Sequence, residues 1–141
     1  MSGRAWLRAL TPEAESALGG AEVAIIDRYP FRIGRESRYP GPTERYAGEE
    51  RRSSRAGRNN ELYLFDRARP LFISREHLEI RRSSGGGHEV SERGSACGTL
   101  VGNRYIGGDR SLGASPVEDG NTIVIGGPES PYVFRFECKS E

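Results

Sequence analysis

Short runs in which apolar residues occupy every second position, separated by glycine-rich turns, constrain the fold of this chain more than any other feature. The clearest run is YVFRFE at 132–137, where Tyr132, Phe134 and Phe136 fall on alternate positions. Because successive side chains of a strand point to opposite faces of its sheet, this run predicts a strand with one aromatic face. We therefore expect strands that each bury one face.

Comparable runs recur along the chain. They lie at 22–35 (interrupted at Tyr29-Pro30), 61–66, 76–92, 98–106 and 121–126. Ser83–Gly87 suits a hairpin loop, and Gly102-Asn103 suits a two-residue turn with positive φ. Many short strands at close spacing predict an all-β fold, in which two antiparallel sheets pack as a sandwich. The residues expected in its core are Ile33, Leu64, Leu78, Ile80, Val90, Ile123, Ile125, Phe134 and Phe136.

Two stretches depart from the strand pattern. Residues 11–20 predict one short helix, with Thr11 as its cap, Pro12 at its first position and Gly19 at its end. Residues 36–58 have no apolar period and carry six arginines and four glutamates. Long segments without regular structure tend to be functional or disordered, so we expect a mobile loop insertion there.

Length, charge and cysteine usage exclude several classes of protein. The 141 residues suit a single domain, 1–141, with its core at about 5–137. A formal charge of +1 gives no argument for a nucleic-acid or membrane surface. The two cysteines, Cys97 and Cys138, are too few for a disulfide framework and indicate a reducing compartment. No apolar run approaches the roughly 20 residues of a membrane span, and the first ten residues lack a signal peptide's apolar stretch. We expect a cytoplasmic protein without a membrane partner.

The motif ISREH at 73–77 places chemically active side chains just ahead of a predicted strand. A hydrolase would use Ser74 as nucleophile and His77 as base, whereas a binding module would use Ser74 and Arg75 to hold an anion. The chain lacks the Gly-x-Ser-x-Gly elbow of one large class of serine hydrolases. The motif therefore favours binding, and we expect no enzymatic activity.

Two further hypotheses concern metals and nucleic acids. Cys97, Cys138, His77 and His88 do not show the close ligand spacing of zinc sites, so we expect no metal and no cofactor. Nucleic-acid binding would rest on the arginines of residues 36–58. Their positive charge is diluted by four glutamates, which argues against a nucleic-acid partner.

Four motifs occur in a characteristic order. FRIGR at 31–35 is followed by ISREH at 73–77, by ERGSACGTLVGN at 92–103 and by VEDGNTIVIG at 117–126. In this order they resemble the forkhead-associated (FHA) domain, a sandwich of about eleven strands that binds phosphothreonine peptides through loops at one end. The resemblance spans nearly the whole chain. It implies a phosphorylation-dependent interaction module whose partner is a threonine-phosphorylated protein, either a kinase or a kinase substrate.

The resemblance also implies roles for single residues. A phosphothreonine carries about two negative charges and three strong acceptor oxygens, which suit a guanidinium and a hydroxyl. Arg35 and Ser74 match the family's phosphate contacts, and Arg75 matches a position that holds the peptide backbone or the phosphate. His77 matches a buried residue that hydrogen-bonds between the recognition loops. The other supporting positions are Gly34, Gly94, Ser95, Gly98 and Thr99.

Four positions depart from the family pattern. Cys97 replaces the asparagine that grips the peptide main chain, and Ala96 stands where some members supply a second hydroxyl. Gly102-Asn103 reverses the family's Asn-Gly, which displaces Asn103 by one residue, and Asn121 replaces an aspartate. Ala96, Cys97 and Asn103 still fall on the expected peptide-binding surface. Because a thiol is a weak donor and acceptor, the alternative is an FHA-fold scaffold that binds a protein partner without phosphate.

Overall fold

Strands account for nearly all the regular structure. The structure, a computed structural model, describes residues 4–36, 59–108 and 112–139. Within these ranges, the elements in chain order are β1 (Arg4–Ala9), α1 (Pro12–Ala17), β2 (Val23–Ile26), β3 (Phe31–Arg35), β4 (Leu62–Leu64), β5 (Leu78–Arg82), β6 (His88–Glu92), β7 (Thr99–Val101), β8 (Arg104–Ile106), β9 (Ala114–Val117), β10 (Thr122–Ile125) and β11 (Val133–Lys139). The expected all-β class is confirmed.

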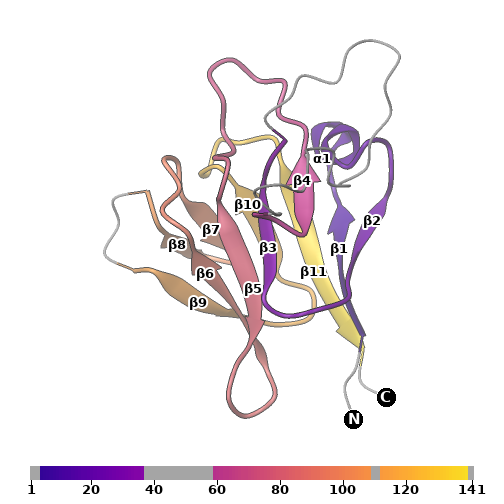
Figure 1. Cartoon of the computed structure of the whole chain (residues 1–141), viewed down its shortest axis with the longest axis vertical. Coiled ribbons are helices and arrows are strands. Elements are labelled where there is room, and N and C mark those ends of the chain that lie inside the picture. Colours follow the sequence, from indigo (N-terminus) through magenta and orange to yellow (C-terminus); the bar gives the residue numbers. More distant parts are fainter. Residues whose placement is uncertain (1–3, 37–58, 109–111, 140–141) are drawn as a thin grey trace.

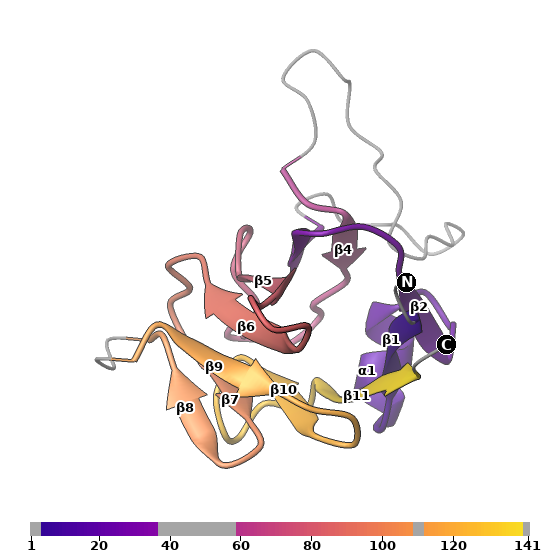
Figure 2. The same cartoon turned by 90° about the horizontal axis from the view of Figure 1, so that it is seen from below.

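The strands form two sheets that pack face to face (Figure 2). The larger sheet has the order β2-β1-β11-β10-β7-β8 and the smaller one the order β4-β3-β5-β6-β9. All nine residues expected in the core lie between the sheets, each no more than 1% exposed. The alternation in the sequence therefore identified the inward faces correctly.

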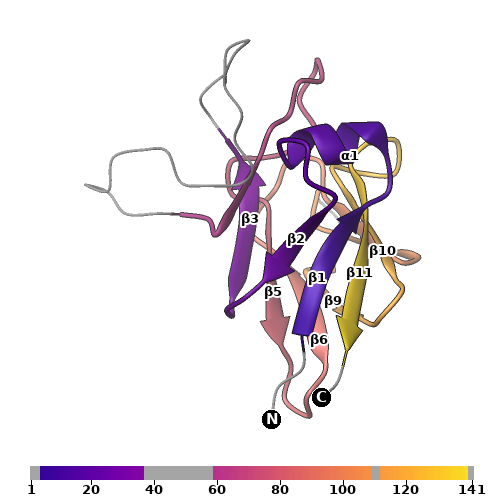
Figure 3. The same cartoon turned by 90° about the vertical axis from the view of Figure 1, so that its right-hand side faces the viewer.

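The first and last described strands are neighbours in the larger sheet. Leu7 of β1 lies opposite Phe136 of β11, and both side chains are buried. Figure 3 shows these two strands side by side, with both termini at one end of the sandwich and α1 at the other. The end that carries α1 is also the end from which the loop between β4 and β5 rises (Figure 1).

One strand pairing differs from the antiparallel pattern that the sequence predicted. β3 pairs with β4 in parallel, whereas every other pairing in the described part of the chain is antiparallel. Two parallel strands need a long connection, because the chain must return to the end of the sheet at which the first strand began before the second strand can start. The stretch 36–61 is that connection. The expected mobile insertion at 36–58 lies, apart from Glu36, outside the described residues.

The expected helix and turns are present. The Thr11 hydroxyl accepts a hydrogen bond from the Ala14 backbone N–H at 3.1 Å, so Thr11 caps α1. Gly102 has a φ of 60° in the two-residue turn between β7 and β8, a conformation that costs glycine little. In the described ranges, no helix is long and apolar enough to cross a membrane.

Candidate functional site

Three connections, together with the adjoining ends of β3 and β7, contain all the residues that the sequence singled out for the site except Asn103. They are residues 36–61 after β3, residues 65–77 after β4 (loop 65–77) and residues 93–98 after β6 (loop 93–98). Loop 65–77 rises at the end of the sandwich opposite the termini (Figure 1). Of the first connection, the structure describes only Glu36 and residues 59–61.

The end of β3 runs unusually close to loop 65–77. A Cβ atom on Gly34 would lie 1.9 Å from the Arg75 carbonyl oxygen, so only glycine fits there. The Arg35 backbone N–H donates to the Ser74 carbonyl at 3.0 Å. Arg35 Nη1 also donates to the Ile73 carbonyl at 3.0 Å. The half-buried Arg35 side chain is thereby held beside Ser74.

His77 connects loop 65–77 to loop 93–98. The imidazole is fully buried, and its Nδ1 accepts the Ser74 backbone N–H at 3.0 Å. Because Nδ1 is an acceptor, the ring proton lies on Nε2, which donates to the Gly98 carbonyl at 2.8 Å. Burial lowers the pKa of His77, and the neutral ring is the form that both contacts require.

Ser74 makes a second connection between the same two loops. Its hydroxyl oxygen accepts the Ala96 backbone N–H at 3.0 Å. A serine hydroxyl that accepts through one lone pair still has its own O–H to donate. The side chain is half-buried. Ser74 can therefore offer a hydrogen to an acceptor arriving from solvent.

Loop 93–98 is closed by Glu92, a residue that the sequence did not single out. One carboxylate oxygen of Glu92 accepts from both the Ser95 hydroxyl and the Ser95 backbone N–H, and the other accepts from the Thr99 hydroxyl at 2.6 Å. Ser95 Oγ in turn accepts the Gly98 N–H at 3.0 Å. The signal in the sequence is an acid three residues before a serine, a spacing that suits local side-chain-to-backbone bonds.

Asn60 is the second supporting residue that the sequence did not single out. It is fully buried, and its amide nitrogen donates to the Arg75 carbonyl at 2.9 Å. Its amide oxygen accepts from Arg93 Nη1 at 2.6 Å. Asn60 thus joins all three connections. No local pattern marks it, because both partners of its side-chain amide are distant in sequence.

The remaining site residues lie at the surface of these loops or beyond them. The Arg75 and Ala96 side chains are exposed, and Gly94 is exposed with a φ of 87°. Cys97 is half-buried, with Sγ 3.9 Å from the Leu71 carbonyl, and its own carbonyl accepts the Tyr105 hydroxyl. Asn103 is exposed in the β7–β8 turn, and no hydrogen bond within the described ranges joins it to the three connections.

Among the described residues, no cluster of His, Cys, Asp or Glu could hold a metal ion.

The sandwich and its loop cluster define the chain as a β-sandwich protein with a polar, arginine-bearing loop surface. The FHA domain family model matches residues 52–126, more than half of the chain. The chain therefore belongs to the FHA domain family, as the motif order predicted. The match includes Ser74, His77 and loop 93–98, but not Arg35. Members of this family are protein-interaction modules and not enzymes.

Solved structures with the same fold include Mycobacterium tuberculosis EmbR in complex with a low-affinity phosphopeptide. That chain is 17% identical with a TM-score of 0.59, and the match covers 99% of this chain and 25% of EmbR. The FhaA FHA domain, complexed with the intracellular domain of Rv3910, is 18% identical with a TM-score of 0.53, and the match covers 96% and 99% of the two chains. The yeast Pml1 splicing factor is 17% identical with a TM-score of 0.61, and the match covers 99% and 82%. This chain spans about a quarter of EmbR, and no curated protein matches its sequence significantly.

Proposed function

We propose that this protein binds phosphothreonine peptides through loops 65–77 and 93–98, with Arg35 and Ser74 contacting the phosphate. The proposal is supported by the position of Arg35 next to Ser74: the Arg35 backbone N–H donates to the Ser74 carbonyl, and its guanidinium donates to the Ile73 carbonyl. The buried His77 separately holds Ser74 through the Ser74 backbone N–H. A guanidinium has five N–H donors. In the described part of the chain, the Arg35 guanidinium makes one hydrogen bond, to the Ile73 carbonyl. The remaining donors suit a group with about two negative charges.

The other residues of the surface have supporting roles in the proposal. Arg75, which is exposed next to Ser74, holds the peptide backbone or the phosphate in this proposal. Asn60 fixes the Arg75 main chain through its carbonyl. Ala96, Cys97 and Asn103 line the path of the residues after the phosphothreonine.

The proposed partner is a threonine-phosphorylated protein. Both cysteines are free thiols, which supports the cytoplasmic location that the composition indicates.

A phosphate-independent scaffold is the second candidate function. It is favoured by Ala96 and Cys97, which replace side chains that would contact the phosphate or the peptide main chain. The Ala96 backbone N–H is already engaged by the Ser74 hydroxyl, so this N–H is not free to donate to a phosphate. A scaffold would bind phosphorylated and unphosphorylated forms of a partner segment equally well.

Titration of matched phosphorylated and unphosphorylated peptides against the wild type and Arg35→Ala tests the proposal. Charge-assisted hydrogen bonds are worth about 1.5–3 kcal/mol each, so Arg35→Ala should weaken phosphopeptide binding at least about tenfold. Loss of the single bond to Ile73 should lower the free energy of unfolding by no more than about 1 kcal/mol. The phosphoserine version should bind about fourfold more weakly, because one buried methyl is worth about 0.8 kcal/mol.

Arg28→Ala is the matched control, because Arg28 is an exposed arginine between β2 and β3, outside the three connections and the β7–β8 turn. It should bind the phosphopeptide as the wild type does. If Arg35→Ala binds the phosphopeptide with unchanged affinity, the phosphate site is wrong. If the wild type does not distinguish the two peptides, the scaffold becomes the better description.

A further inference from the structure

β2 forms a free edge of the larger sheet. The Ala9 N–H donates to the Glu22 carbonyl in the register that joins β1 and β2. Hydrogen-bonded and non-bonded pairs alternate in an antiparallel ladder, so the main-chain groups of Val23 and Ile25 point away from β1. No described residue forms a backbone hydrogen bond with them. The edge therefore offers two N–H groups and two carbonyls.

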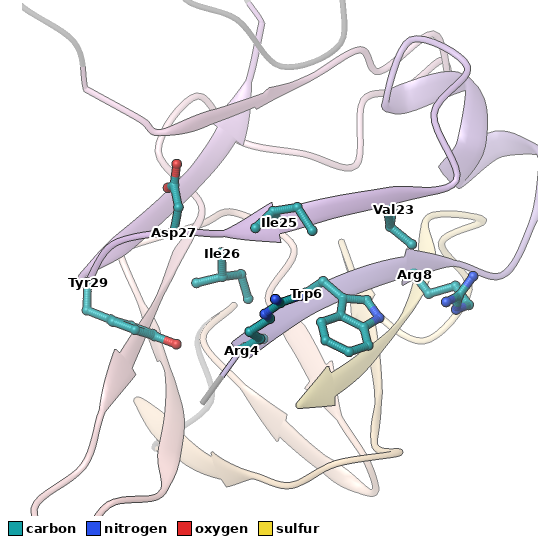
Figure 4. Close-up of a pocket in the computed structure, with 9 residues that line it drawn as sticks. Arg4, Trp6, Arg8, Val23, Ile25, Ile26, Asp27 and Tyr29 are labelled. Atoms are coloured by element: carbon teal, nitrogen blue, oxygen red, sulfur yellow. The ribbon is translucent and has the colours of Figure 1, made fainter. Parts of the chain in front are cut away.

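The same edge exposes apolar surface. Ile25 is 59% exposed, more than any other large apolar residue in the described ranges. A groove of about 680 Å³ lies beside it, lined in part by Trp6 and Val23 (Figure 4). Edge strands are usually protected by charge or by proline, and also by short length. The edge strands β2 and β9 are both four residues long, but β9 also carries the exposed Pro116, whereas β2 has the sequence VAII.

The outer face beside this edge carries an excess of positive charge. The rows of the β1–β11 register on that face are Arg4 opposite Lys139, Trp6 opposite Glu137, and Arg8 opposite Arg135. Like charges directly opposite each other destabilise a sheet. Glu137 is the only acid in these rows, and it accepts hydrogen bonds from Trp6, Arg8 and Arg135. One further acid, Asp27, lines the groove, so the face remains complementary to carboxylates.

We propose that the β2 docking surface, made of the β2 edge with Arg4, Trp6 and Arg8 of β1, binds an extended acidic segment of a partner protein as an added strand. The main chain of that segment supplies the partners for the free groups of Val23 and Ile25. An apolar side chain covers Ile25, and carboxylates face the two arginines. A peptide is favoured over nucleic acid or lipid because the free ladder groups match a peptide backbone. This surface uses none of the phosphate-site residues, so it is independent of the proposed function.

NMR titration of the ¹⁵N-labelled chain with an unphosphorylated peptide of about eight residues tests this proposal. Glutamate and valine take turns at every second position of the peptide, with threonine between them, so that both face the same side of the added strand as Ile25, Arg4 and Arg8. We expect the amide signals of Val23 and Ile25 to shift on binding. Ile25→Glu should abolish the shift of the Val23 amide, because it removes the apolar contact and places a like charge against the acidic peptide. Leu112→Glu is the matched control, since Leu112 is 41% exposed outside β2, and it should bind normally. Arg4→Glu should weaken binding about fivefold by reversing an exposed charge.

Each alternative occupant gives a distinct result. Equal binding of a peptide with lysine in place of glutamate would overturn the acidic preference. Shifts of the Val23 and Ile25 amides that depend on protein concentration without peptide would assign the edge to a second copy of the chain. A single-stranded oligonucleotide or phosphatidylserine vesicles that displace the peptide would also overturn the proposal. Arg35→Ala should bind the valine–glutamate peptide like the wild type, which separates this surface from the phosphate site.

Discussion

Both ring nitrogens of His77 are engaged, and this residue couples protonation to loop structure. Nδ1 accepts from the Ser74 N–H, so a proton can bind there only if that hydrogen bond breaks. Burial also disfavours the charged ring and lowers the pKa of His77. The unfolded chain, in which the imidazole has a pKa of about 6.5, therefore binds the proton more readily than the folded chain does.

The first prediction concerns the effect of pH on stability. A group whose pKa is lowered by folding contributes stability above its unfolded pKa, and this contribution is lost as the pH falls below it. The free energy of unfolding should therefore fall between about pH 7.5 and about pH 5.5. The pKa of His88 is also lowered, mainly by burial and also by the charge of Arg82, so the measurement belongs in a His88→Gln background. Urea denaturation at a series of pH values measures the free energy of unfolding. A free energy of unfolding that does not change over this range would contradict the role of His77.

At the scale of single elements, loop 93–98 between β6 and β7 contains two glycines with positive φ, Gly94 and Gly98, and their surroundings differ. Gly98 has a φ of 82°, its carbonyl accepts the His77 Nε2–H, and an added Cβ would lie 2.4 Å from the Tyr105 ring and 2.8 Å from the Ile106 carbonyl oxygen. Gly94 has a similar φ of 87°, but open space surrounds its Cβ position. An alanine would be strained by the positive φ at either position, but only at position 98 would its Cβ also clash with neighbouring atoms.

Gly98→Ala should accordingly destabilise the fold more than Gly94→Ala does. The shared left-handed conformation costs an alanine about 1–2 kcal/mol in either position. Only Gly98→Ala must also displace the Ile106 main chain, so its loss of unfolding free energy should exceed that of Gly94→Ala by at least about 1 kcal/mol. Parallel urea denaturation of the two variants measures the difference. Equal losses would show that loop 93–98 is not packed against β8 as described.

At the scale of the whole molecule, the strands nearest the two ends of the chain hold the larger sheet together. β11 lies between β1 and β10, and its Phe134 and Phe136 are fully buried. The segment matched by the family model, 52–126, lacks β1, β2, β3 and β11. We propose that the chain folds as one domain. The matched segment alone would then expose the core faces that β3 and β11 cover.

A fragment of residues 52–126 should therefore remain unfolded. Its NMR spectrum should show narrow amide proton dispersion, and its far-UV circular dichroism should show no cooperative thermal transition. Residues 1–141 serve as the folded reference. A fragment with dispersed signals and a cooperative transition would show that the strands outside 52–126 are dispensable, which the burial of Phe134 and Phe136 argues against.

The amino-acid sequence by itself determined most of the strands, most of the turns and the order of the FHA motifs, but it marked neither β1 nor β9. These features are local, because alternation sets which face of a strand is buried and glycine sets where the chain turns. Ile33 and Phe134 were predicted as core residues on that basis and are buried. Arg35, Ser74 and His77 were likewise selected from short motifs. Their contacts with the ligand stay predictions.

Only the tertiary structure decided which distant segments meet. The parallel pairing of β3 with β4 depends on the return of the chain through 36–61. The contacts of Asn60 with Arg75 and Arg93 join residues that no sequence spacing relates. The same holds for the rows of arginine and lysine on the outer face, which exist because β1 pairs with β11 from the other end of the chain. The physical reason is that local patterns fix the conformation of a segment, whereas packing between segments fixes which side chains become neighbours.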